Sequence, residues 1–219
     1  MGVACNPAIV RDGLVLCLDA GNPKSYPGSG TTWTDLSGFG KNGTFDNMDS
    51  TNYSSSNGGG LNFNGTDDYI TISQRETSSA FTYEAFLMST DVSKDQMYVG
   101  TISDAFYLRI RLSKAYLSLT AGQQETLTHE TTLQNNQVYH IVSIYNGVQL
   151  KIYVNNVLTS GTIINAAMTN WGADRIGRWR DIEQRSFVGN IYTLRAYNRE
   201  LTAAEIQQNY IATKSRFGL

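Results

Sequence analysis

The sequence predicts an all-β fold: a two-sheet antiparallel jelly-roll sandwich with one short C-terminal helix. Three observations predict it. Thr, Ser, Asn and Gly supply more than a third of the 219 residues, and these residues favour strands and turns over helices. From Leu61 onward, short segments that alternate apolar and polar residues recur between turn residues. Helical periodicity with a capping signal is found near the C-terminal end.

The first part of the chain is predicted to be mostly loop. All three prolines, Pro7, Pro23 and Pro27, lie in its first 27 residues, and glycine-rich turns punctuate residues 20–60. Neither an internal repeat nor a linker interrupts the sequence. We therefore expect a single domain over residues 1–219.

The strands are predicted from their period of two. Ile70 and Ile72 alternate with polar residues, and Phe81 begins a longer alternating run to Met88. Further strands are expected at 97–102, 105–112, 115–120, 125–132 and 186–197.

The segment from Val138 to Leu158 gives the strongest local signal. Asn146-Gly147 separates two strand-like runs and is typical of a two-residue type I′ hairpin turn. Such a turn would place a mostly apolar set of cross-strand pairs on the core side: Tyr145–Val148, Ser143–Leu150, Ile141–Ile152 and Tyr139–Val154. Asn155-Asn156 offers a second turn, which makes a three-strand meander.

A capping box begins the one predicted helix. The hydroxyl of Thr202 can accept from the amide of Glu205, whose side chain can reach back to Thr202. Ile206 and Tyr210 follow four residues apart with Ile211 alongside, so we expect this stripe to dock on the sheets.

Composition excludes several classes of protein. A net charge of −2 and a low charged fraction of 16% argue against nucleic-acid binding, and no apolar run reaches the length of a membrane span. Cys5 and Cys17 are too few for a disulfide scaffold, and we expect free thiols rather than a bridge. The first residues lack the basic and apolar regions of a signal peptide, so we expect no export.

Several stretches, taken in order, resemble the laminin-G-like, concanavalin A-like lectin and glucanase jelly rolls. They are Leu61–Ile70 (LNFNGTDDYI), Phe81–Phe86 (FTYEAF), Tyr139–Val142 (YHIV), Ile152–Asn156 (IYVNN), Phe187–Ile191 (FVGNI) and Tyr197–Ile206 (YNRELTAAEI). Phe86 and Tyr139 stand where the family usually has tryptophan, and Asn156 where it has glycine.

The opening segments, Asp12–Asn22 and Trp33–Thr44, are similar to those of jelly-roll proteins carried by tailed bacteriophages. This resemblance implies a virion structural protein, either a capsid decoration protein or a fibre domain. Its partners would be other virion proteins, in an oligomeric assembly, and possible host-surface glycans. The protein would be made in the host cytoplasm and localised to the virion. Proteins of this fold also include glycan-binding modules and glycosidases, so the fold alone leaves the function open.

Acidic and amide residues of the loops are candidate calcium ligands, since oxygen donors suit a hard cation. They are Asp19, Asn22, Asp35 and Asn42 in the opening loops, with Asp67 and Asp68 in the next hairpin. The alternative is that these are ordinary turn residues that bond their own backbone.

Glycan binding needs exposed aromatic rings. Trp33 and Trp171, and with them Trp179, lie in loop-like or strand-end positions and are candidate sugar platforms, the alternative being that they cap the core.

A basic segment follows Trp171. Residues 175–219 carry a net charge of +4 and residues 1–174 one of −6, and arginines surround Trp179: Arg175, Arg178, Arg180 and Arg185. We expect this loop to project from one end of the sandwich and to attach the chain to an acidic neighbour. The alternative is a solvated loop with local acidic partners.

No catalytic constellation is evident. Glycosidases need two carboxylates about 5–9.5 Å apart, and the one spaced pair, Asp181 and Glu183, has the wrong sequence order and lies in the arginine-rich loop. No nucleophile motif accompanies His129 or His140, and His140 is expected to have a local partner in a strand. We therefore predict a non-enzymatic virion protein; a carbohydrate-binding module is the alternative and a glycosidase the third.

Overall fold

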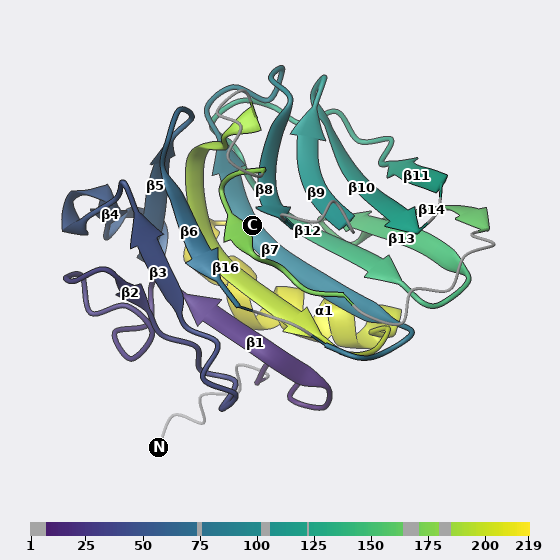
Figure 1. Cartoon of the computed structure of the whole chain (residues 1–219), viewed down its shortest axis with the longest axis horizontal. Helices are drawn as coiled ribbons and strands as arrows, with labels where there is room; N and C mark the ends of the chain where they lie inside the picture. The colour runs from purple at the N-terminus through teal and green to yellow at the C-terminus, as the bar shows by residue number, and fades with distance from the viewer. Residues whose placement is uncertain (1–7, 74–75, 102–105, 122, 164–170, 180–184) are drawn as a thin grey trace.

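Two antiparallel β-sheets pack face to face in the computed structural model of the chain (Figure 1). The structure describes residues 8–73, 76–101, 106–121, 123–163, 171–179 and 185–219. The predicted jelly-roll sandwich with one short C-terminal helix is confirmed.

The first sheet, called sheet A, has the order β14-β13-β12-β7-β16-β5-β4, with β1 also paired to β16. Its strands in chain order are β1 Leu14–Asp19, β4 Tyr53–Ser54, β5 Gly60–Asn64, β7 Phe81–Ser89, β12 Val138–Tyr145, β13 Gln149–Val154, β14 Val157–Ile163 and β16 Val188–Tyr197.

The second sheet, called sheet B, has the order β11-β10-β9-β8-β15-β6-β3-β2. Its strands are β2 Thr32–Trp33, β3 Gly43–Asp46, β6 Tyr69–Ile72, β8 Gln96–Gly100, β9 Phe106–Arg111, β10 Lys114–Ala121, β11 Gln123–Thr128 and β15 Arg175–Ile176. Within the described residues, every predicted strand is thus present, with bounds that differ by a few residues.

The core between the sheets is rich in aromatic rings. Phe81 lies 5.2 Å from Trp171 and 5.3 Å from Phe106, centroid to centroid, and Tyr83 packs against both of those partners. Aromatic pairs at this separation stabilise a core beyond the area that they bury. They join β7 of sheet A to β9 of sheet B.

The β12–β13 hairpin keeps the predicted faces but not the predicted register. Tyr145 pairs with Leu150 and Ser143 with Ile152, two residues beyond the expected partners. The cause is a longer connection: four residues, 146–149, separate the paired Tyr145 and Leu150, in place of the predicted two-residue turn. The side chain of Asn146 stabilises this connection, since it accepts from the backbone N–H groups of Val148 and Gln149, at 3.1 and 2.8 Å. A shift of two preserves side-chain direction, so the predicted apolar face still meets the core.

The second predicted turn, at Asn155-Asn156, joins β13 to β14 and completes the meander. Both asparagines have positive φ, 48° and 67°, as a type I′ turn requires.

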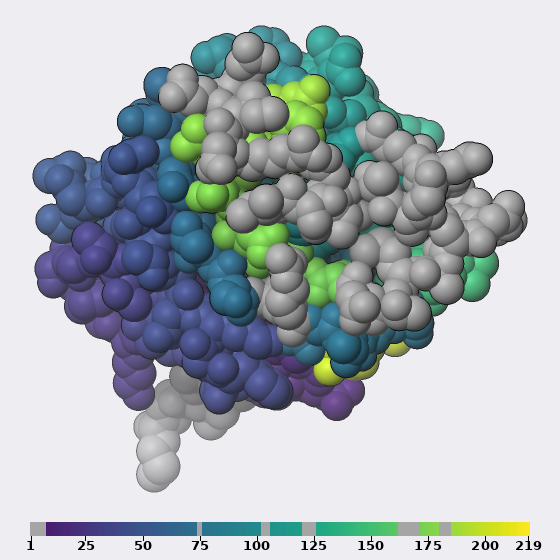
Figure 2. Space-filling view, viewed as in Figure 1, coloured from purple at the N-terminus to yellow at the C-terminus, as the bar shows by residue number. Residues whose placement is uncertain are grey.

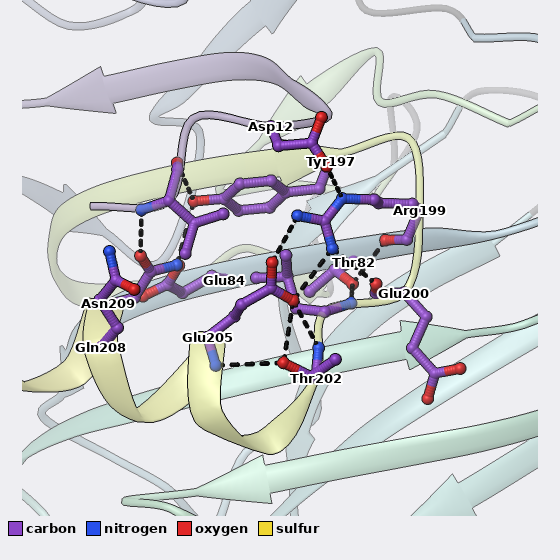
Figure 3. A network of polar contacts seen from close by, with 12 residues as sticks. Asp12, Thr82, Glu84, Tyr197, Arg199, Glu200, Thr202, Glu205, Gln208 and Asn209 are labelled. Carbon is purple, nitrogen blue, oxygen red and sulfur yellow. Dashed lines mark hydrogen bonds and ion pairs between the residues drawn. The ribbon is translucent and has the colours of Figure 1, made fainter. Parts of the chain in front are cut away.

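Helix α1, Ala203–Lys214, lies on the outer face of sheet A (Figure 1). The predicted capping box is present: the side chain of Thr202 accepts from the Glu205 amide, and Glu205 accepts from the Thr202 amide (Figure 3). Ile206 docks on the sheet as expected, but Ile211 is 41% exposed and does not. The buried stripe continues instead through Asn209 and Thr213, because their side chains have hydrogen-bond partners on sheet A.

A buried polar network holds α1 to sheet A (Figure 3). The carboxylate of Glu84, 1% exposed, accepts from His140 Nε2 at 2.8 Å, Arg195 Nη1 at 3.0 Å and Asn209 Nδ2 at 2.7 Å. Asn209 also donates to the Tyr197 hydroxyl and accepts from the amide of Val10. The network therefore ties the helix and the segment before β1 to three central strands, β12, β7 and β16.

Residues 20–60 are mostly loop, as expected, and cover one flank of the molecule in purple and blue (Figure 2). Short 3₁₀ turns, η1 Ser50–Asn52 and η2 Ser56–Gly58, interrupt them, and another, η4 Ser215–Phe217, follows α1. Cys17 is free and buried, while Cys5 lies outside the described residues. In the part of the chain described, no helix is long and apolar enough to cross a membrane.

Candidate functional site

The two tryptophans predicted as sugar platforms are core residues. Trp33 is 0% and Trp171 2% exposed, and Trp171 Nε1 donates to the hydroxyl of Ser78 at 2.7 Å. The prediction that their rings face solvent is wrong, because both extend between the sheets, where an indole fills a large volume. Trp179 is half-buried, with the guanidinium of Arg185 4.3 Å from its ring centroid.

Asp35 and Asp19, two of the predicted calcium ligands, already bind groups of the chain. Asp35 accepts from the amides of Cys17, Ser37 and Lys41 and from the Ser37 hydroxyl, at 2.6 to 3.0 Å. Both carboxylate oxygens of Asp19 accept from Arg216 Nη1, at 2.8 and 2.9 Å. Neither carboxylate keeps the free oxygens that a calcium ligand needs.

Asn22 and Asn42 likewise serve the turns: Asn22 Oδ1 accepts from the Lys24 amide and Asn42 Oδ1 from that of Asp35.

Asp67 and Asp68 lie in the β5–β6 turn, where Asn64 organises the backbone. Asp68 is 3% exposed and accepts from the Asn64 amide and from Asn52 Nδ2, while Asp67 accepts from Asn64 Nδ2. Burial, the largest effect, raises the pKa of Asp68. Among the described residues no three His, Cys, Asp or Glu side chains gather in a way that would hold a metal. The geometry of Asp67 and Asp68 thus fits residues that stabilise a turn.

The described beginning of the basic segment, residues 175–179, belongs to sheet B and is not a projecting loop. Arg175 belongs to β15, which lies inside sheet B between β8 and β6. Arg175 and Arg178 are only 8% and 7% exposed, and the ring of Tyr69 lies against both guanidinium groups. Arg180 lies outside the described residues. Residues 175–179 therefore pack on sheet B, where Arg175 and Arg178 contact the ring of Tyr69.

A polar groove of about 380 Å³ opens on the outer face of sheet A, beside η1 and η2. Strand alternation builds its floor: Leu61 and Phe63 point into the core, so Asn62 between them points out. Asn62 pairs across the sheet with Asn190, and Asn190 pairs with Met88 on its other side.

The wall of the groove comes from the loop between η1 and η2. Asn52 fixes the wall to the floor, since its Nδ2 donates to the Asn62 carbonyl at 2.9 Å. Asn57 Nδ2 contacts the hydroxyl of Tyr192 at 3.3 Å. The residues of the described chain that line the groove are uncharged: Thr51, Asn52, Tyr53, Ser54, Ser56, Asn57, Asn62, Met88, Asn190 and Tyr192.

Two amides of the groove remain available. Within the described structure, the side chains of Asn62 and Asn190 make no hydrogen bond, and Asn62 is exposed while Asn190 is half-buried. Each offers two N–H donors and one carbonyl acceptor. The groove can therefore exchange several hydrogen bonds with a neutral polyhydroxylated ligand.

The histidines are bound in structural contacts. His140 pairs with Glu84, as predicted, and His129 contacts the carbonyl of Val157 at 2.8 Å through Nε2 and accepts from the Thr131 amide through Nδ1. Burial, the largest effect, lowers the pKa of His129. The spaced acidic pair Asp181 and Glu183 lies outside the described residues.

Sequence reasoning missed the groove because it looked for tryptophan. The signal was present in the alternation of Leu61, Asn62 and Phe63, which marks Asn62 as outward-facing. The sequence could not show that β5 pairs with β16, and this pairing places Asn62 beside Asn190.

The fold resembles several solved structures. Domain 4 of an extracellular arabinanase from Geobacillus stearothermophilus, in complex with arabinotriose, aligns with a TM-score of 0.71 at 16% identity over 91% of this chain and 98% of that domain. The botulinum neurotoxin serotype G binding domain aligns with a TM-score of 0.67 at 14% identity over 90% of this chain and 50% of that one.

A Trypanosoma rangeli sialidase in complex with sialic acid also aligns, with a TM-score of 0.67 at 16% identity, over 98% of this chain and 35% of the sialidase. At these identities the likeness shows the fold. No curated protein sequence matches the chain.

Residues 64–207, about two thirds of the chain, match the sequence model described as the concanavalin A-like lectin/glucanases superfamily. This match covers the sheet-forming stretches from β6 to the first turns of α1, and the two-sheet architecture agrees with it. The chain therefore belongs to the concanavalin A-like lectin/glucanases superfamily.

Proposed function

We propose that this chain is a non-enzymatic carbohydrate-binding domain whose binding site is the asparagine-lined groove of sheet A. The observation that carries the proposal is the lining itself: four asparagines, two tyrosines and three hydroxyl residues, with no charged side chain.

The chemistry of the lining suits sugars. A sugar ring presents hydroxyl groups that both donate and accept, and asparagine is the side chain that matches both roles without a charge. The free amides of Asn62 and Asn190 lie on adjacent strands, so one ring can contact both. Tyr53, half-buried at the wall, offers a ring to the apolar face of a sugar.

Relatives in fold support the proposal. The arabinanase domain, which this chain matches over nearly its full length, was solved with a neutral trisaccharide, and the neurotoxin relative is a binding domain. Fold does not decide function, so the support lies in the agreement between the neutral trisaccharide of the arabinanase domain and the uncharged lining of the groove.

The absence of catalysis is part of the proposal. Glu84 is saturated by three donors beneath α1, and Asp19, Asp35 and Asp68 are bound to donors of the chain. A glycosidase needs one carboxyl group to donate a proton and another to act as nucleophile or base. None of these four carboxylates lines the groove.

We further propose that the domain is carried on a tailed-phage particle as a capsid decoration or fibre domain, where the groove would contact host-surface glycans. The resemblance of its opening segments to phage jelly-roll proteins supports this. Mass spectrometry of purified particles tests it: the chain should be present in stoichiometric amount, and its absence would reject the virion role while leaving glycan binding untouched.

A glycan array tests the binding function. The labelled protein should bind neutral glycans, with arabinotriose among the probes, and an array without signal would reject the proposal. The double variant Asn62→Ala/Asn190→Ala should lose at least about tenfold in affinity for the best neutral glycan, since two sets of hydrogen bonds disappear. Gln207→Ala is the matched control, because it removes an exposed amide outside the groove lining.

A further inference from the structure

Arg178 is a buried guanidinium with no hydrogen-bond acceptor among the described residues. It is 7% exposed, and within the described structure its one recorded contact is with the ring of Tyr69, whose centroid lies 5.1 Å from Arg178 Cζ. Arg178 Nε is fully enclosed and makes no hydrogen bond there. Removing a charge from water without an acceptor is costly, so a group that completes the site would bind favourably.

A second guanidinium lies on the same ring. Arg175 Cζ is 4.3 Å from the centroid of Tyr69, and Arg175 is 8% exposed. Strand geometry fixes both ring and cation: Tyr69 lies on β6, and Arg175 on the adjacent β15 pairs with Thr71. Two like charges are thus concentrated beside one aromatic ring.

Neighbouring arginines of sheet B are neutralised in the ordinary way. Asp95 contacts Arg109 at 3.3 Å, Arg185 at 3.5 Å and Arg111 at 4.0 Å. No described ion pair of this kind involves Arg178. On this face Asp95 meets three arginines, whereas no carboxylate of the described residues pairs with Arg178.

We propose that Arg178, which lies against the ring of Tyr69 with the positive charge of Arg175 beside it, binds an oxyanion: a carboxylate, sulfate or phosphate group. The fork of a guanidinium matches two oxygens of such a group, and burial strengthens the charge-assisted hydrogen bonds. Because little of either arginine is exposed, the site takes a single anionic group and not a whole sugar ring. It lies on sheet B, away from the groove of sheet A, and does not depend on the carbohydrate-binding proposal.

Titration with two probes tests the site and identifies its source of anion. Inorganic sulfate represents a free ion, and glucuronic acid, with glucose as its neutral match, represents an acidic sugar. Isothermal titration is performed at fixed ionic strength on the wild type and Arg178→Met, which keeps an apolar stem against Tyr69. Arg111→Met is the control, since Arg111 is an exposed arginine of the same sheet.

Binding of either probe to the wild type, weakened about tenfold or more in Arg178→Met and unchanged in Arg111→Met, is the expected result. Binding of both probes would indicate a general oxyanion site, and binding of glucuronic acid alone an acidic-sugar site. If neither probe binds, or if Arg178→Met binds as the wild type does, the proposal is overturned. Arg178→Lys, which keeps the charge and loses the fork, serves if Arg178→Met does not fold: it should bind more weakly than the wild type.

Discussion

Arg195 and Arg178 are both buried arginines on the outward-facing sides of the two sheets, yet their surroundings differ. Arg195, 3% exposed, donates to Glu84 at 3.0 Å and to the Thr213 hydroxyl at 3.1 Å. Arg178 lies against the ring of Tyr69 with no described acceptor. Both arginines keep a buried Nε–H without an acceptor among the described residues. The difference lies in charge: Arg195 is paired with the Glu84 carboxylate, whereas no described carboxylate pairs with Arg178.

The difference separates folding from binding. The Glu84 carboxylate is paired with Arg195 and bonded to Asn209 of α1, so the role of this network is to dock the helix. Burial alone would raise the pKa of Glu84, but Arg195, His140 and Asn209 outweigh that effect and the pKa lies below its ordinary value. Unused donors, at Arg178 and in the groove, mark the regions that can bind other molecules.

The largest expected effect comes from removing the cation of the Glu84 network beneath α1. Arg195→Met should lower the free energy of unfolding by about 3–5 kcal/mol, because it leaves the buried charge of Glu84 without its cation. Urea denaturation measures this, with the exposed Arg111→Met as control. A loss below about 1 kcal/mol would show that the network is not what holds this face.

The helix cap is a smaller part of the same face. Thr202→Ala should cost about 1 kcal/mol, since the Glu205 amide loses its acceptor. Thr44→Ala controls for the loss of a hydroxyl, since Thr44 is an exposed threonine in β3 whose side chain makes no hydrogen bond within the described structure. Equal melting temperatures for the two variants would mean that the cap adds nothing.

Arg178→Met should change the free energy of unfolding by less than about 1 kcal/mol in anion-free buffer. It removes an uncompensated buried charge, which offsets the lost contact with Tyr69. The same urea titration gives the value. A loss as large as that of Arg195→Met would contradict the comparison, because it would reveal an internal partner for Arg178.

Acid should weaken the α1 face through Glu205. Hydrogen bonds from Arg199, the largest effect, and from Thr202 lower the pKa of Glu205 from 4.5 to about 2, despite partial burial. Because the folded pKa is the lower one, its contribution is fully present above pH 4.5 and is lost as the pH falls towards 2. Glu205→Gln should therefore show a shallower loss of stability across this window than the wild type, and equal slopes would refute the assignment.

The smallest expected effect is that of chelation. Since Asp19 and Asp35 bind groups of the chain, EDTA should leave the melting temperature unchanged, with added calcium as the reverse control. A calcium-dependent rise would restore the sequence-based prediction of a calcium site, with Asp67 and Asp68 as the first ligands to replace.

The fold could be predicted because its signals are local. Alternation in β6 and β7, the capping box at Thr202 and the turn at Asn155-Asn156 each depend on a few neighbouring residues. The register of β12 and β13 could not be predicted, because it depends on the length of the turn. That length is set by hydrogen bonds from the amides of Val148 and Gln149 to the side chain of Asn146.

The candidate sites depend on pairs that are distant in sequence, which is why they escaped prediction. Asn62 meets Asn190 only through the β5–β16 pairing, and Tyr69 meets Arg178 only because β15 inserts beside β6. Residue type also misled: tryptophan suggests a sugar platform, yet Trp33 serves the core.

The most direct test of the account is an NMR titration of ¹⁵N-labelled protein with the neutral glycan that gives the highest array signal. The side-chain NH₂ resonances of Asn62 and Asn190 should shift with the glycan, and the Nε–H resonance of Arg178 on the other sheet should not. Shifts that cluster on sheet B, or that leave both asparagine amides unchanged while the glycan binds, would contradict the claim that the groove is the carbohydrate site.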